Sequence, residues 1–269
     1  MKISILLLSL LLLSFTPVPP IINPDGTTIA TRINPPQGYK RETLDSTSFG
    51  YYLRNFPLIK HDSKVYQYDG KEKWNANVHE AVLNIDVGDK DLQQCADAVM
   101  RLRAEYLYKR KQYDKIHFNF TNGFNAEYKK WAEGYRIKVN GNSTTWYKAG
   151  VSSYSYLNFR KYMELVFNYA GTLSLTKELK AISVNDIQAG DVFIKGGSPG
   201  HAVLVVDVAV NSTTGKKVFL VAQSYMPAQD IHVLKNFEQP ALSPWYDIST
   251  MDKLYTPEWT FSKTELKRF

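Results

Sequence analysis

Four apolar runs in the last third of the chain constrain its fold most strongly. Val, Ile and Leu dominate these runs, and such residues favour strands. Gly, Pro and Asn lie between the runs and favour turns. The link NSTTG at 211–215 predicts a hairpin between the second run and the third. The runs are DVFIKGG (191–197), HAVLVVDVAV (201–210), KKVFLVAQSY (216–225) and DIHVLKN (230–236).

The segment 89–109, DKDLQQCADAVMRLRAEYLYK, has the periodicity of an amphipathic helix. Asp89 or Asp91 is its expected N-cap, because a carboxylate can accept a hydrogen bond from a first-turn N–H. A second helix is predicted over 155–171, SYLNFRKYMELVFNYAG, and Gly171 can end it. The apolar stripe of the first helix consists of Leu92, Cys95, Ala96, Val99, Leu102 and Tyr106.

Shorter strands are predicted before and between these helices. The stretches 48–59, 63–70 and 80–91 are apolar or aromatic and end in turn residues. Residues 113–150 predict a strand and a hairpin with an NGN turn. No internal repeat and no Pro-, Gly- or Ser-rich linker divides the chain. The sequence therefore predicts a single α+β domain over 19–269.

The first residues of the chain have the pattern of an export signal. Lys2 is followed by an apolar run that is shorter than the ~20 residues of a membrane span. We therefore expect a signal peptide at 1–18 and a periplasmic or secreted protein, with an uncleaved membrane anchor as the alternative. No cysteine lies near the end of the run, which argues against a lipid anchor. Residues 19–49 are rich in Pro, Gly and Thr and predict an extended N-terminal arm.

Charge and residue patterns narrow the expected partners. The net charge of +7 favours proximity to an anionic cell-wall polymer or a membrane surface. Nucleic acid is not an expected partner, because the basic residues do not cluster with interleaved aromatic residues. The sequence contains no HxxxH, HExxH or CxxC pair, so neither a metal nor another cofactor is expected. The oligomeric state stays open.

Cys95 is the only cysteine, so no disulfide can form within the chain. Two interpretations of this residue are open. It is either a small apolar residue on the buried face of a helix, or a nucleophile. A nucleophilic thiol needs a base, and five histidines are available. His201 is the best candidate, because it follows the GGSPG turn and begins an apolar strand.

The predicted hairpin gives His201 a specific neighbour. Its loop centres near residue 213, so the numbers of paired residues sum to roughly 426. His201 then lies opposite about residue 225, and Gln223 shares its face of the sheet. A slip of one residue would offer Ser224 instead. Gln223 or Ser224 is therefore the candidate for orienting the imidazole.

The segment AGDVFIKGGSPGHAVLVVDVA resembles the GD–strand–turn–GH–strand segment of the NlpC-type cell-wall peptidases and the related CHAP amidases, which have a papain-like fold. QQCADAV, PGH and AQS resemble the cysteine helix, the histidine strand and the third-residue strand of those families. The resemblance implies a papain-like α+β fold, with Cys95 as nucleophile, His201 as base, and Gln223 or Ser224 as the orienting residue. It also implies that residues 113–180 are an insertion.

The whole mature chain further resembles an uncharacterised family of exported bacterial proteins, the domain-of-unknown-function family 4846. The stretches FGYYLRNFPL, DLQQCADAVMRLRAEYLY and GDVFIKGGSPGHAVLVVD carry this resemblance. It implies no particular activity.

These features favour an exported cysteine hydrolase that cleaves an amide bond in a peptidoglycan-type peptide of the cell envelope. The alternative is a non-catalytic protein of the same fold that binds a cell-wall glycan or peptide. In that case aromatic side chains would line a groove and stack on sugar rings. The candidates for such stacking are Trp131, Trp146, Tyr225 and Trp245.

Overall fold

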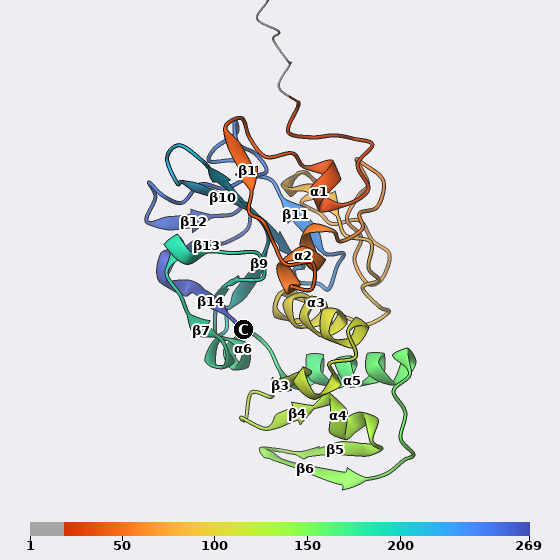
Figure 1. The fold of residues 1–269 in the computed structure, drawn as a ribbon. Helices are drawn as coiled ribbons and strands as arrows, with labels where there is room; N and C mark the ends of the chain where they lie inside the picture. The colour runs from red at the N-terminus through yellow and green to blue at the C-terminus, as the bar shows by residue number, and fades with distance from the viewer. Residues whose placement is uncertain (1–18) are drawn as a thin grey trace, which may run out of the picture.

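One antiparallel sheet forms the framework of the chain (Figure 1). The computed structural model describes residues 19–269, and the predicted signal peptide at 1–18 lies outside the described residues. The strands of the sheet are β1 (Tyr39–Arg41), β2 (His79–Val82), β7 (Lys180–Ala181), β8 (Val192–Lys195), β9 (His201–Asn211), β10 (Lys217–Gln223), β11 (His232–Leu234) and β14 (Leu266–Arg268). Their order is β2-β11-β10-β9-β8-β14-β7, and β1 pairs with the end of β9. The four predicted C-terminal strands are confirmed as β8 to β11.

Six α-helices and three small hairpins complete the described residues. The helices are α1 (Ile29–Arg32), α2 (Phe49–Arg54), α3 (Cys95–Lys109), α4 (Tyr128–Ala132), α5 (Tyr156–Tyr169) and α6 (Thr172–Glu178). The hairpins pair β3 (His117–Asn119) with β4 (Asn125–Glu127), β5 (Tyr135–Asn140) with β6 (Ser143–Lys148), and β12 (Lys253–Tyr255) with β13 (Thr260–Ser262). This mixture confirms the predicted α+β class. No helix in residues 19–269 is both long and apolar enough to span a membrane.

The residues between α3 and α6 form a lobe beside the sheet. In Figure 1 residues 113–170, drawn yellow-green to green, lie on one side of α3, and the large sheet lies on the other. Buried side chains of the lobe and of α3 belong to one continuous hydrophobic cluster. The predicted hairpin at NGN is confirmed as β5–β6, and the second predicted helix is confirmed as α5.

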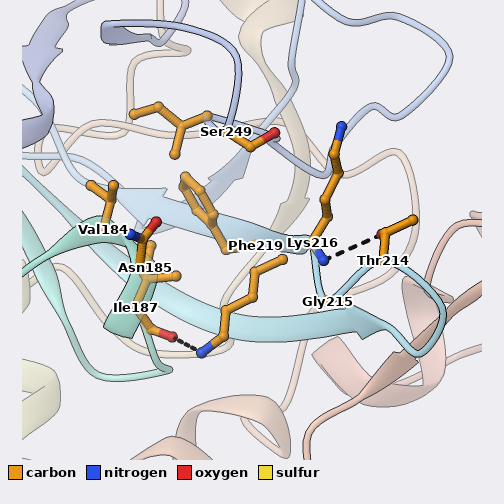
Figure 2. Close-up of a pocket in the computed structure, with 10 residues that line it drawn as sticks. Val184, Asn185, Ile187, Thr214, Gly215, Lys216, Phe219 and Ser249 are labelled. Atoms are coloured by element: carbon orange, nitrogen blue, oxygen red, sulfur yellow. Dashed lines mark hydrogen bonds between the residues drawn. The ribbon is translucent and has the colours of Figure 1, made fainter.

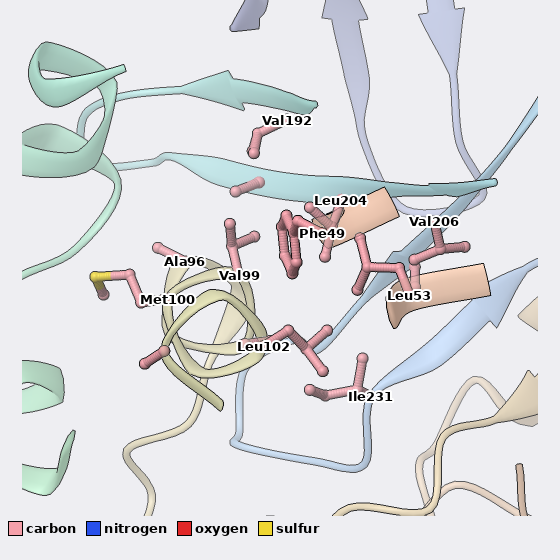
Figure 3. Close-up of a cluster of buried hydrophobic side chains, with 14 of the residues drawn as sticks. Phe49, Leu53, Ala96, Val99, Met100, Leu102, Val192, Leu204, Val206 and Ile231 are labelled. Carbon is pink, nitrogen blue, oxygen red and sulfur yellow. The ribbon is translucent and has the colours of Figure 1, made fainter. Parts of the chain in front are cut away.

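Strand β9 is buried on both faces over most of its length. This explains why its sequence is an almost continuous apolar run, whereas a strand with one solvated face would alternate. Ala202, Leu204 and Val206 pack in the cluster that contains α2 and α3 (Figure 3). Val203 and Val205 pack in a second cluster with Phe193, Phe219 and Phe261. The strand that begins at His201 is therefore fixed from both sides.

Two of the predicted strands are wrong. Residues 48–59 contain helix α2, because the Ser48 hydroxyl caps its start by accepting a hydrogen bond from the Tyr51 N–H at 3.1 Å. Phe49 and Leu53 of α2 are buried together with α3 (Figure 3). Residues 63–70 form isolated bridges and no regular strand. Their partners are single residues of other loops, so no ladder propagates.

Candidate active site

Cys95 is the first residue of helix α3. The predicted N-cap at Asp89 or Asp91 is wrong, because the residues before Gln94 form tight turns instead of a helical turn. The Asp91 carboxylate instead accepts a hydrogen bond from the backbone N–H of Ala228 at 2.7 Å. The first helical hydrogen bond runs from the Ala98 N–H to the Gln94 carbonyl at 2.9 Å. The N–H groups of the first three helical residues therefore have no acceptor within the helix.

The sulfur of Cys95 lies at the end of β9. Backbone N–H groups of Ala96, Ala202 and Cys95 itself lower the pKa of the Cys95 thiol, which places the sulfur close to this end of β9. Ala202 directly follows His201 in the chain. The two candidate catalytic residues, Cys95 and His201, therefore both lie near the first residues of β9. The ring of Tyr225 lies close to His201, at a centroid distance of 5.0 Å. Burial raises the pKa of the Tyr225 phenol, and Glu258 and Cys95 add to this rise.

His201 and Gln223 form the contact that the sequence predicts. The Nε2–H of His201 donates to Oε1 of Gln223 at 2.8 Å. Both side chains are buried, with exposed fractions of 2% and 1%. This hydrogen bond uses Nε2, so Nδ1 is the nitrogen left to act as a base. The ring packs on its other side against Trp259, at a centroid distance of 5.3 Å.

The register of the β9–β10 hairpin explains this pairing. Residues Val221 and Ala222 pair with Val205 and Leu204, so the paired numbers sum to 426 in this half of the hairpin. Beyond a bulge between Leu220 and Val221 the sum is 427. The predicted register is therefore confirmed at the end of the hairpin that carries His201. It places the Gln223 side chain on the same face of the sheet as the His201 side chain.

Ser224 does not take part in this contact. Its hydroxyl lies 2.9 Å from the carbonyl of Gln93 and 2.8 Å from that of Gln229. Neighbouring residues of a strand point to opposite faces, so a side chain next to Gln223 is directed away from the imidazole. Of the two candidates for orienting His201, the geometry selects Gln223.

Three further residues complete the polar cluster around Gln223, and none of them is predicted to lie there. Glu258 accepts a hydrogen bond from Nε2 of Gln223 at 2.6 Å. Lys73 pairs with the same carboxylate at 2.7 Å, and both of these charged side chains are buried. The Nε2 atom of His232 lies 3.5 Å from Nε2 of Gln223. Lys73 and Glu258 are far apart in sequence, and a lone charge in a loop normally indicates a solvated position.

A hollow of about 270 Å³ opens beside Cys95. One wall comes from the start of α3, and the opposite wall comes from the GGSPG turn and the start of α6. This turn is held tightly, because a Cβ atom on Gly200 would lie 2.4 Å from Oγ1 of Thr172. Two carboxylates, Asp91 and Asp97, are among the residues that line the hollow, and no Lys or Arg is. Burial raises the pKa of the Asp97 carboxyl well above its ordinary value, so the negative charge of the hollow rests mainly on Asp91. The hollow therefore favours neutral or cationic groups over anions.

Burial keeps both candidate catalytic groups neutral. It raises the pKa of the Cys95 thiol to about 11, and the nearby Asp97 carboxyl adds to this rise. The three backbone N–H groups at the sulfur oppose the shift without cancelling it. Burial also lowers the pKa of His201 to about 4, against the hydrogen bond that the ring donates to Gln223, which raises the pKa. At neutral pH the site therefore holds a thiol and a neutral imidazole rather than an ion pair.

We predict that Cys95 in the free protein reacts slowly with iodoacetamide at pH 7. A pKa of about 11 lies ~2.5 units above that of a free cysteine, so the thiolate fraction is lower by about 300-fold. The alkylation rate should rise about tenfold per pH unit towards pH 10. Stopped-time mass spectrometry against a small-molecule thiol measures this profile. A rate that is already constant between pH 6 and 8 would instead indicate a thiolate–imidazolium pair.

A second hollow, of about 290 Å³, lies at the start of β10 (Figure 2). It is lined by Val184, Asn185, Ile187, Thr214, Gly215, Lys216, Lys217, Phe219, Ile248 and Ser249. The ammonium of Lys217 donates to the Ile187 carbonyl at 3.0 Å across its floor. No cysteine or histidine is among these lining residues, so the chemistry is assigned to the hollow at Cys95.

Two of the four aromatic residues predicted to line a binding groove, Trp131 and Trp245, do not line one. Trp245 is fully buried and Trp131 nearly so. The indole N–H of Trp245 donates to the Asn34 carbonyl at 2.8 Å, and that of Trp131 donates to Asn158. These two rings are core residues and cannot stack on a ligand.

No group of three or more His, Cys, Asp or Glu in residues 19–269 has the arrangement of a metal site. One protein-family model, described as "Domain of unknown function (4846)", matches residues 29–268. No curated protein and no solved structure was found to match the chain.

Proposed function

The chain belongs to the family of domain of unknown function 4846, which names no activity. From the geometry of the site we propose that it is an exported cysteine hydrolase with a papain-like arrangement. Its substrate would be an amide bond in a peptidoglycan-type peptide of the cell envelope. The observation that carries the proposal is the buried His201–Gln223 pair at the end of β9, next to a cysteine at a helix start and a hollow.

The neutral ground state supports a general-base mechanism. Nδ1 of His201 takes the thiol proton as the Cys95 sulfur attacks the amide carbon. The resulting oxyanion would lie at the start of α3, where the N–H groups of the first helical residues have no carbonyl acceptor within the helix and the helix dipole favours negative charge. The imidazolium then protonates the leaving amine, which leaves a thioester on Cys95. Water, deprotonated by His201, hydrolyses the thioester and restores the thiol.

One set of observations favours the alternative, a non-catalytic protein that binds envelope peptide or glycan. The Cys95 thiol has a raised pKa, and α3 covers one face of β9 while the His201 ring packs towards Phe261 of the second cluster. The two groups therefore lie near the same end of β9 but on opposite faces of the strand. In the hydrolase, substrate binding must bring the sulfur and Nδ1 into contact.

The test uses the mature chain and a defined mixture of peptidoglycan stem peptides and disaccharide peptides. We expect the wild type to release one new amine and one new carboxylic acid per cleaved bond, detected by mass spectrometry. Cys95→Ala should bind the same peptides by calorimetry and cleave none. If both proteins bind and neither cleaves, the protein is a binding protein. Cleavage by Cys95→Ala would exclude the thiol as nucleophile.

A further inference from the structure

The His201–Gln223 pair is part of a network of hydrogen bonds between buried polar side chains. It runs from Nζ of Lys73 to Glu258 at 2.7 Å, from Glu258 to Nε2 of Gln223 at 2.6 Å, and from Oε1 of Gln223 to His201 at 2.8 Å. The Lys73 and Glu258 side chains have exposed fractions of 1% and 5%. A buried ion pair rarely stabilises a fold more than apolar residues of the same volume do. Fold stability alone therefore does not account for this pair.

The chemistry of Lys73 and Glu258 determines the direction of donation in every hydrogen bond of this network. An ammonium can only donate, and a carboxylate can only accept. Glu258 is therefore an acceptor towards Gln223, and the amide of Gln223 must turn its NH₂ group to Glu258. Its oxygen must then face His201, which requires the proton of the imidazole to sit on Nε2.

His232 reinforces this direction from the neighbouring strand. Nδ1 of His232 lies 2.8 Å from the carbonyl oxygen of Asp230, which can only accept, so Nδ1 carries the proton. Its Nε2 is then an acceptor, and it lies 3.5 Å from the NH₂ group of Gln223. Burial lowers the pKa of His232 to about 3, which keeps this ring neutral. Both amide hydrogens of Gln223 thus face acceptors.

We infer that Glu258, held by Lys73, is a positioning residue that locks the amide of Gln223 and thereby fixes the proton of His201 on Nε2, which leaves Nδ1 free to act as the base. This inference rests on the proposed function for its catalytic consequence. The tautomer itself is a property of the free protein and can be measured without any substrate.

The decisive variant is Glu258→Gln. The new amide must turn its oxygen to the Lys73 ammonium, so its NH₂ group faces Gln223. Gln223 then flips, presents its own NH₂ to His201, and selects the tautomer with the proton on Nδ1. The 3.5 Å contact with His232 opposes this flip less than the 2.6 Å contact at position 258 drives it. Nitrogen NMR of the histidine-labelled protein distinguishes the two tautomers, and a His201→Gln sample assigns the signals. We expect Nε2–H in the wild type and predominantly Nδ1–H in Glu258→Gln.

An exchange of the two residues provides a rescue that a purely structural role would not predict. In Gln223→Glu/Glu258→Gln, the new glutamate accepts from both His201 Nε2–H and the new amide, and the amide oxygen still accepts from Lys73. The Nε2–H tautomer should return. Glu72→Gln is the matched control, because Glu72 forms an exposed pair with Lys64 at 2.6 Å and lies next to Lys73 in sequence.

Hydrolysis should fall about a hundredfold in Glu258→Gln, mainly in kcat, and recover in the exchange variant. The inference is overturned if Glu258→Gln folds and keeps the Nε2–H tautomer, whatever its activity. If no protein cleaves any peptide but the tautomer changes as described, the positioning role stands and the proposed hydrolysis fails. If Glu258→Gln does not fold, Lys73→Met/Glu258→Met removes both buried charges, and retention of a fixed Nε2–H tautomer there would also overturn the inference.

Discussion

Replacement of His201 by Ala is expected to lower amide hydrolysis by about 10³- to 10⁴-fold while the protein stays folded. The size of the loss follows from the neutral ground state, in which the Cys95 thiol has a pKa of about 11 and reacts only if a base takes its proton. Ala at position 201 removes that base. The measurement is kcat/KM on the best stem peptide, with circular dichroism as a check of folding.

His117→Ala is the matched control for this experiment. His117 is an exposed histidine of β3 that lies 3.4 Å from Glu178, far along the chain from the strand end. Its replacement should leave kcat/KM within a factor of two. Added imidazole should restore part of the activity of His201→Ala if the cavity admits it. Equal activities of wild type and His201→Ala would remove His201 from the mechanism.

Asp207→Ala is expected to have the largest effect on stability, a loss of about 3–5 kcal/mol in the free energy of unfolding. The Asp207 side chain is fully buried on β9, and it binds Nε of Arg41 and Nε of Arg54 at 2.6 Å each. Its removal leaves two arginines without their carboxylate in the interior. Because Arg41 lies on β1 and Arg54 on α2, the N-terminal elements should detach from the sheet first.

Equilibrium unfolding in urea measures this loss, and hydrogen exchange locates it in the segments around β1 and α2. Asp207→Asn should lose less, because it keeps one oxygen acceptor. Glu164→Ala is the control, since Glu164 pairs with Lys90 at the surface and its removal should not change the unfolding midpoint measurably. A midpoint for Asp207→Ala equal to that of the wild type would mean that the two arginines find other partners.

Four neighbouring strands of the sheet, β8 to β11, and the His201–Gln223 contact are predictable from the sequence because local rules determine both. A five-residue loop sets the hairpin register, and the two-residue period of a strand then decides which side chains share a face. The predicted sum of roughly 426 matches the observed pairing of Val221 with Val205. A bulge one position further along changes the sum, yet it lies on the side away from His201.

Other parts of the site depend on contacts between residues far apart in the sequence, and no local sequence pattern predicts such contacts. Lys73 and Glu258 come together across 185 residues, and charged residues in loops are normally solvated, so neither segment predicts the pair. The start of α3 was placed too early because Asp91 has a capping side chain, but that side chain bonds to the distant Ala228 N–H. Residues 48–59 were predicted as a strand from their aromatic content, whereas packing of Phe49 against α3 favours a helix.

The lobe has a consequence for how this protein could diversify. The reacting groups come from α3 and the sheet, whereas Phe167 and Ala170, at the end of α5, supply another part of the hollow's wall. Under the proposed function, part of the wall beside the thiol is thus encoded apart from the candidate catalytic residues. Exchanging residues 113–170 between members of the family would change this part of the hollow and leave Cys95, His201 and Gln223 unchanged, so the lobe is a natural unit for altering selectivity.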